Sequence, residues 1–128
     1  MSYHLFLDDE RKPKDVTWVE LPLHQWMIAR NYQQFVEMIE RMGLPTTISF
    51  DHDLSEQSYE FVREAIATGK VPYDKIKEKT GFHCAKWLIE YCLDKNLELP
   101  YYYIHTMNPV GAENIRGLLV GFEKFKST

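Results

Sequence analysis

Ile48-Ser49-Phe50-Asp51-His52-Asp53-Leu54 is an apolar run that breaks abruptly into three polar side chains able to bind a metal ion. The preceding residues, Thr46 and Thr47, are β-branched and follow Pro45, so a buried strand is predicted over 46–50. Polar residues directly after such a strand bring functional groups to the edge of a sheet. We therefore expect the rest of the chain to be organised around the end of this strand.

Two further predicted strands end in the same way. The run 3–7 stops at Asp8-Asp9-Glu10-Arg11, and the run 101–104 stops at His105-Thr106-Met107-Asn108-Pro109. The segment 25–29 is short and apolar, and it fits either another strand or the start of a helix. The stretch 12–22 contains two prolines and is expected to be a loop.

Helical patterns lie between these strands. They predict helices over 32–42, 80–96 and 111–126, and the first two begin at the good N-cap residues Asn31 and Thr80. Strands and helices in alternation predict an α/β domain with a mostly parallel sheet. Because parallel strands end at the same edge of a sheet, the three polar clusters are expected to meet there.

Residues 55–79 interrupt this alternation. The segment is polar and rich in alternating charge, with one helical piece over 59–66 that ends near Gly69. A connection of this length in a compact domain is often a lid or a binding loop. With 128 residues and 45% hydrophobic content, the chain 1–128 is expected to form a single domain that contains this insertion.

Composition excludes several classes of function. The net charge of −4 argues against non-specific nucleic-acid binding and duplex DNA, which require a basic surface. Membrane insertion is not expected, because no segment reaches about 18 apolar residues, and the N-terminus resembles no signal peptide. Cys84 and Cys92 lie on one predicted helix, too far apart to pair, and are expected to be core thiols. These features predict a cytoplasmic protein; they specify no oligomeric state.

The acidic residues predict a metal site. Asp8, Asp9 and Asp51 offer the oxygen ligands that Mg²⁺ prefers, and nearby histidines extend the choice to Mn²⁺. Carboxylates gathered at one edge repel each other unless a cation neutralises them. Asp53 ranks second as a ligand, because it shares a side with Asp51 only if the strand continues. His52 is expected to point to the other side of the strand. The alternative for all of these acids is helix capping.

Other polar residues fit a phosphate-processing site. His105 is suited to proton transfer. Phosphate-binding groups are expected among Thr106, Asn108, Gly111, Arg11 and Thr80. Simpler structural roles stay open for several of them: His105 as a hydrogen-bonded strand end, Asn108 as the cap of the last helix, and Arg11 as part of a solvated turn.

The motifs at 5–11, 48–54, 80–81 and 104–109, in this order, resemble the cyclic-phosphate processing receiver domain, a divergent relative of the response-regulator receiver. The resemblance covers 5–122 and implies a three-layer flavodoxin-like fold with strand order 2-1-3-4. It also implies a role with cyclic phosphates of nucleotides or RNA ends. By analogy with receivers, Asp8 and Asp9 would hold Mg²⁺ and Asp51 would accept a phosphoryl group. Thr106 would match the hydroxyl residue of the fourth receiver strand.

One departure from a receiver affects the functional hypothesis. A receiver has a fifth strand with a lysine that contacts the phosphoryl group, whereas here only a helix with Lys124 and Lys126 is expected after the fourth strand. The first hypothesis is therefore a metal-dependent phosphoesterase, with Asp51 and His105 as catalytic residues. The second is a non-catalytic sensor that binds a cyclic nucleotide, with Tyr59, Phe61 or Tyr73 stacking on the base. The third is a signalling receiver phosphorylated on Asp51.

Overall fold

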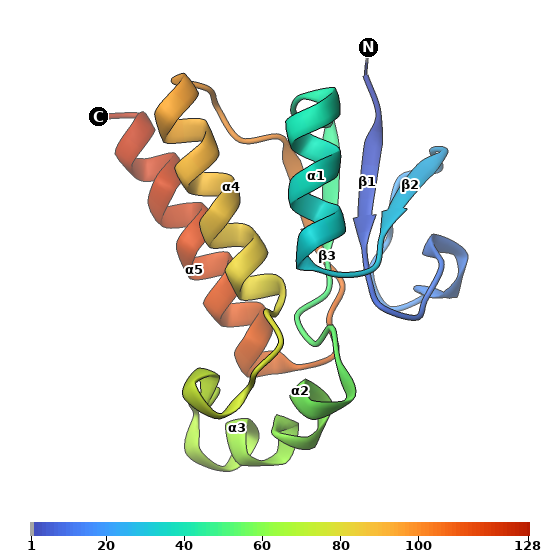
Figure 1. Ribbon diagram of the computed structural model, residues 1–128, viewed down its shortest axis with the longest axis vertical. Coiled ribbons are helices and arrows are strands. Elements are labelled where there is room, and N and C mark those ends of the chain that lie inside the picture. Colours follow the sequence, from blue (N-terminus) through green and yellow to red (C-terminus); the bar gives the residue numbers. More distant parts are fainter. Residues whose placement is uncertain (1) are drawn as a thin grey trace.

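A four-stranded parallel sheet forms the centre of the protein (Figure 1). The computed structural model describes residues 2–128. The strands are β1 (His4–Leu7), β2 (Trp26–Ala29), β3 (Thr47–Phe50) and β4 (Tyr101–Ile104), in the order β2-β1-β3-β4, and all three neighbouring pairs are parallel. The predicted order 2-1-3-4 is thus confirmed. The ambiguous segment 25–29 is a strand.

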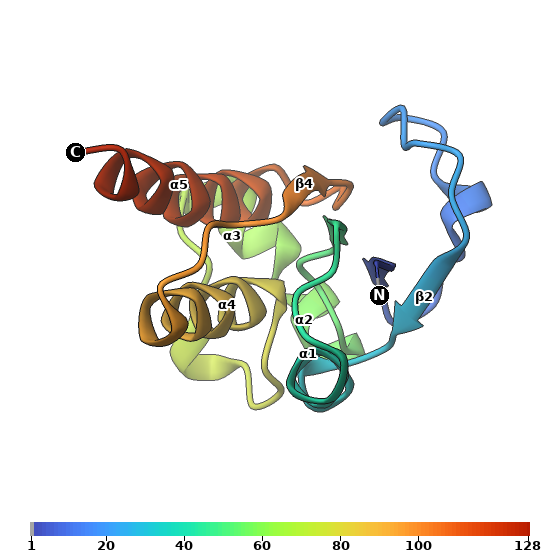
Figure 2. The ribbon, with the colours of Figure 1, turned by 90° about the horizontal axis from the view of Figure 1, so that it is seen from above.

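The two faces of the sheet are covered differently (Figure 2). Helices α1 (Tyr32–Met42), α4 (Gly81–Lys95) and α5 (Pro109–Lys126) form one continuous layer, in which α4 contacts both α1 and α5. The opposite face is covered by the connection between β1 and β2, whose one regular element is the 3-10 turn η1 (Pro13–Asp15). The third layer of the domain is therefore irregular, as the two prolines of this segment predicted.

Successive side chains along each strand point to opposite faces of the sheet. Leu5 and Leu7 of β1 and Ile48 and Phe50 of β3 are fully buried in the main core beneath the helices. Phe6 lies between Leu5 and Leu7, so it points to the other face. The helices contribute a further set of buried residues to the main core: Phe35, Ile39, Cys84, Ala85, Leu88, Cys92, Ile115, Leu119 and Phe122. The two cysteines are buried free thiols, as expected.

Helices α1, α4 and α5 begin directly after the predicted N-cap residues. The side chains of Asn31, Thr80 and Asn108 accept hydrogen bonds from backbone N–H groups in the first turns of α1, α4 and α5. The last helix begins at Pro109, two residues before the predicted start, because proline fits the first turn, where no backbone donor is needed. None of the helices in residues 2–128 combines the length and apolar character that crossing a membrane requires.

The insertion 55–79 lies beyond the carboxyl edge of the sheet (Figure 1). It contains α2 (Glu56–Glu60), α3 (Val62–Thr68) and the 3-10 turn η2 (Tyr73–Lys75). The single helical piece predicted over 59–66 is in fact two helices that meet at Phe61. Gly69 ends α3 in a left-handed conformation with φ of 76°, which glycine adopts without strain.

Helix α4 approaches the end of β3 more closely than a side chain would allow. The Gly81 N–H donates to the His52 carbonyl at 2.7 Å. A Cβ atom on Gly81 would overlap the carbonyl oxygen of Asp51, whose backbone position is fixed by a hydrogen bond to Leu7. Gly81 therefore sets the distance between the helix layer and the site described below.

We expect Gly81→Ala to lower the free energy of unfolding by about 2–3 kcal/mol, because the new methyl group forces α4 away from β3. Gly117→Ala in α5 is the matched control: nothing lies within 4 Å of its added Cβ, so helix propensity should raise stability by up to about 1 kcal/mol. Urea denaturation of both variants measures the difference. Equal effects would contradict the close approach.

Candidate functional site

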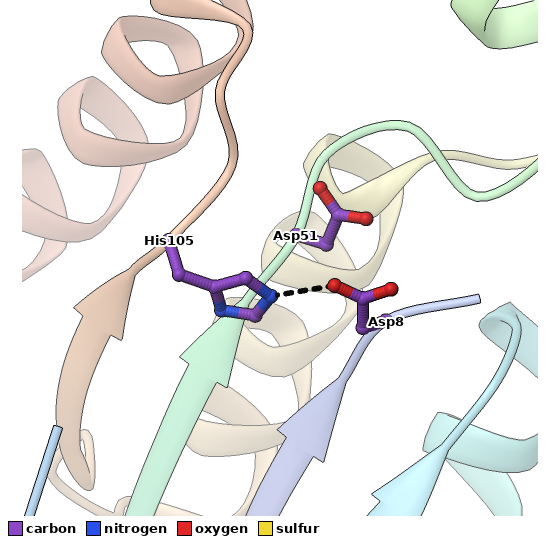
Figure 3. A group of neighbouring side chains, drawn as sticks. All are labelled: Asp8, Asp51 and His105. Atoms are coloured by element: carbon purple, nitrogen blue, oxygen red, sulfur yellow. Dashed lines mark hydrogen bonds and ion pairs between the residues drawn. The ribbon is translucent and has the colours of Figure 1, made fainter. Parts of the chain in front are cut away.

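Three buried side chains from three different strands meet at the carboxyl edge of the sheet (Figure 3). Asp8 follows β1, Asp51 follows β3 and His105 follows β4, and each is at most 1% exposed. One potential ligand atom from each lies within 4.8 Å of the other two. The expectation that polar clusters converge at this edge is confirmed for these three residues, which we call the Asp8–Asp51–His105 cluster.

Asp8 is held as an ionised carboxylate. Its Oδ1 accepts backbone hydrogen bonds from Glu10 at 2.9 Å and Arg11 at 2.8 Å. Its Oδ2 accepts from His105 Nε2 at 3.0 Å and lies 3.5 Å from the Arg11 guanidinium. Burial by itself raises the pKa of Asp8, but the hydrogen bonds from His105 and the two backbone groups outweigh it and leave the pKa below its usual value.

His105 is fixed through both ring nitrogens. An ionised Asp8 requires the proton on Nε2, so Nδ1 accepts from the Ser49 hydroxyl at 2.7 Å. The ring stacks on Phe6 with a centroid distance of 4.5 Å. Burial lowers the pKa of His105, although Asp8 opposes this shift. The imidazole is therefore neutral at pH 7, with a defined tautomer.

Ser49 is a functional residue that the sequence reasoning missed. It is fully buried in β3, on the face opposite the main core. The available signal was its position as a lone small hydroxyl between the apolar residues Ile48 and Phe50. A buried hydroxyl requires a partner, and His105 is that partner.

Asp51 is the electrostatically unfavourable member of the cluster. Its Oδ1 accepts from the His52 backbone N–H at 2.8 Å, but Oδ2 is buried without a hydrogen-bond partner among the described residues. Burial, the charge of Asp8 and, to a smaller extent, Asp53 raise the pKa of Asp51 to about 8. A cation between Asp51 and Asp8 would remove this cost, so the donor set fits a divalent metal ion.

Asp53 lies outside the cluster. Its Oδ1 accepts from Ser58 and faces His52 Nδ1 at 3.0 Å, and its Oδ2 accepts from Asn108 at 3.2 Å. With both oxygens engaged, Asp53 joins α2 and the start of α5 to the end of β3. The geometry shows this structural role, and the metal role expected for Asp53 from the sequence stays a prediction.

His52 points away from the cluster, as strand alternation predicted. Its Nε2 lies 2.9 Å from the Tyr73 hydroxyl, which also accepts from Asn114. Gly111 makes room for this ring, because a Cβ there would overlap it. The Gly111 N–H donates to Asn108. The structure thus shows a packing role for Gly111 against His52, and its expected phosphate-binding role stays a prediction.

The remaining predicted site residues divide into two groups. Thr80 and Asn108 are helix caps whose polar atoms bind the protein itself, and Thr80 is also 3.0 Å from His83. Thr106 lies next to Asp51, where its hydroxyl lowers the pKa of that carboxyl. Arg11 lies beside Asp8, and its side chain is partly exposed.

Asp9 does not point into the cluster. Its carboxylate accepts a hydrogen bond from the Tyr59 hydroxyl of α2 at 3.0 Å. Tyr59 thus connects the insertion to the edge of the site, and burial together with the neighbouring acids raises the pKa of Tyr59 above its ordinary value. Asp9 lies outside the buried Asp8–Asp51–His105 cluster.

Comparison with known proteins identifies one family. The family model described as "Cyclic-phosphate processing Receiver domain" matches residues 3–121. No curated protein and no solved structure matched the chain.

Asp51 makes a testable contribution to pH-dependent stability. With a folded-state pKa of about 8, above the unfolded value, folded Asp51 retains a proton that the unfolded chain loses, so its contribution to stability declines from about pH 4 to 8. In EDTA, we expect Asp51→Asn to be more stable than wild type at pH 8 by about 2–4 kcal/mol, with a smaller difference at pH 4.

Asp53→Asn is the matched control, because it weakens the bonds from His52 and Ser58 and should lower stability by about 2–3 kcal/mol at pH 7. Urea denaturation between pH 4 and 8 measures both variants. A destabilised Asp51→Asn at pH 8 would show that Asp51 is paired in the folded protein.

Proposed function

The chain belongs to the cyclic-phosphate processing receiver family, and we propose that it is a metal-dependent phosphoesterase acting on a cyclic phosphate of a nucleotide or an RNA end. The observation that carries this proposal is the buried, unpartnered oxygen of Asp51 beside the ionised Asp8. A cation bound there would neutralise both carboxylates and remove the cost of keeping Asp51 protonated. Mg²⁺ and Mn²⁺ are ions that fit a pair of carboxylates.

Asp8 and Asp51 would hold the ion, and His105, whose Nε2–H donates to Asp8, would orient that carboxylate beside it. A bound divalent ion supplies charge neutralisation for the phosphate and lowers the pKa of a coordinated water. Asp51 has a free oxygen for this role once it ionises, whereas Asp8 is already fixed by backbone N–H groups.

Arg11 and Thr106 would bind the phosphate oxygens, since both lie beside the cluster and offer N–H or O–H donors. The neutral His105 ring would donate a hydrogen bond from Nε2 to the leaving oxygen of the opening phosphate ring, and that oxygen would take its proton from water. The His105 Nε2 faces Asp8 and carries the proton, and Ser49 keeps the ring in this orientation. Asp9 and Tyr59, which are hydrogen-bonded to each other, lie near the cluster and would border a bound substrate.

The experiment that tests the proposal screens cyclic mononucleotides, cyclic dinucleotides and 2′,3′-cyclic RNA ends with Mg²⁺, Mn²⁺ or EDTA. We expect hydrolysis in the presence of metal and a loss on the order of 100-fold or more in Asp51→Asn, because a ligand is removed. Asp94→Asn on the exposed end of α4 is the control and should retain full activity. An active Asp51→Asn variant would refute the mechanism.

Product analysis in the same screen separates catalysis from binding. Recovery of intact cyclic nucleotide after tight binding would support a sensor in place of an enzyme. A phosphoryl group gained by Asp51 from a small-molecule donor would support the receiver alternative.

Ser49→Ala tests how His105 is positioned. Removal of the hydroxyl leaves Nδ1 unpaired and frees the ring, so we expect kcat to fall about tenfold with little change in KM, together with a shifted pH profile. Ser49→Thr retains the hydroxyl and should restore most of the activity. A Ser49→Ala variant with an unchanged pH profile would show that Ser49 only fills space.

A further inference from the structure

The irregular layer forms one side of an open groove on the face of the sheet opposite the helices. This groove has a volume of about 970 Å³ and lies between the segment 12–24 and the residues Trp26 and Ile28 of β2. This volume is near the upper limit for pockets that bind small molecules. None of the residues of the Asp8–Asp51–His105 cluster lines it, so it is a separate feature that requires its own explanation.

One tryptophan joins the groove to the functional site. Trp18 lines the groove, and its Nε1–H donates to the backbone carbonyl of His105 at 2.7 Å. The guanidinium of Arg11 lies 5.0 Å from the centroid of the Trp18 ring and 3.5 Å from Asp8. A ligand whose phosphate occupies the site next to Arg11 would therefore extend past Trp18 into the groove.

The chemistry of the groove matches a flat aromatic group attached to an anion. Trp18, His24 and Trp26 supply aromatic rings, and Val19, Leu21 and Ile28 supply apolar walls. Lys12 and Lys14 line the same groove and complement a phosphate. A nucleotide combines these properties, because a base stacks on an aromatic ring while its phosphate binds cations.

Part of the backbone around the groove has no backbone partner. Within the described chain, residues 17–25 form no backbone–backbone hydrogen bond, and the Pro22 carbonyl accepts from Trp26 Nε1 at 3.4 Å. In regular structure such N–H and C=O groups would be occupied, whereas here those other than Pro22 could bind the edge of a base. An irregular segment with an apolar floor therefore suits base recognition better than a helix in the same position would.

We propose that this groove binds the nucleobase of the substrate, so that the enzyme processes cyclic phosphates attached to a nucleoside in preference to base-free ones. This inference rests on the proposed function for the phosphate end. The base-binding site is therefore proposed in the groove, and not in the insertion, where the sequence predicted it. Tyr73 is already bound to His52 and Asn114 and stacks on Phe82, and Tyr59 is bound to Asp9.

The test compares two probes, 2′,3′-cyclic AMP and the base-free glycerol 1,2-cyclic phosphate, by calorimetric binding and by turnover in Mg²⁺. We expect wild type to bind the nucleotide at least about tenfold more tightly. Trp26→Leu should remove this preference and leave the affinity and turnover of the base-free probe unchanged, because Trp26 contacts neither Asp8 nor His105. Trp87→Leu in α4, outside the groove, is the matched control and should retain the preference.

Val19→Glu provides a second variant, since Val19 forms part of the apolar wall on the irregular segment and a charge there opposes binding of a base without altering the sheet. It should weaken nucleotide binding as Trp26→Leu does. Equal affinity of wild type for both probes, or an unchanged preference in both groove variants, would overturn the inference. So would self-association that Val19→Glu abolishes without changing nucleotide affinity. Base-dependent binding without hydrolysis would refute the proposed function and leave the groove assignment intact.

Discussion

The buried pair of carboxylates at the end of β1 and β3 is the constraint on which the rest of the site depends. Four N–H donors surround Asp8, so it keeps its charge. Asp51 has one backbone donor and one oxygen without a partner, so the energetic cost of bringing two acids together falls on Asp51. This asymmetry leaves one carboxylate rigid and the other available. It is also the arrangement that a cation would stabilise most.

The convergence of the polar clusters could be predicted from the sequence because it follows from strand geometry. Each cluster comes directly after a short apolar run, and parallel strands bring their carboxyl ends to one edge. Alternation of side chains further predicted that His52 points away from Asp51, and its contact with Tyr73 confirms this. Capping by Asn31, Thr80 and Asn108 was predictable too, since it depends on residues within one turn.

The parts that escaped prediction depend on neighbours distant in the sequence. Gly111 has the pattern of a phosphate-binding helix start, and only the position of His52 shows that packing requires a glycine there. Asp53 has the pattern of a metal ligand, but Ser58 and Asn108 occupy its oxygens. Ser49 was overlooked because its role depends on His105, 56 residues away. Spacing along one segment contains no information about such partners.

The two connections at the carboxyl edge have different consequences for the site. Residues of the insertion form hydrogen bonds with His52 and Asp53 at the end of β3, so the insertion forms a fixed wall on one side, with Tyr59 at its border. The irregular layer is joined near the site by the Trp18 hydrogen bond and the Arg11 contact, and its residues 17–25 have no backbone–backbone hydrogen bond. Rigidity at the cluster and a less hydrogen-bonded backbone in the irregular layer agree with the proposed function, in which the cluster fixes the reacting atoms and the groove accommodates a larger attached group. A helix between β1 and β2 would have used these backbone groups internally, so only an irregular connection leaves them available to such a group.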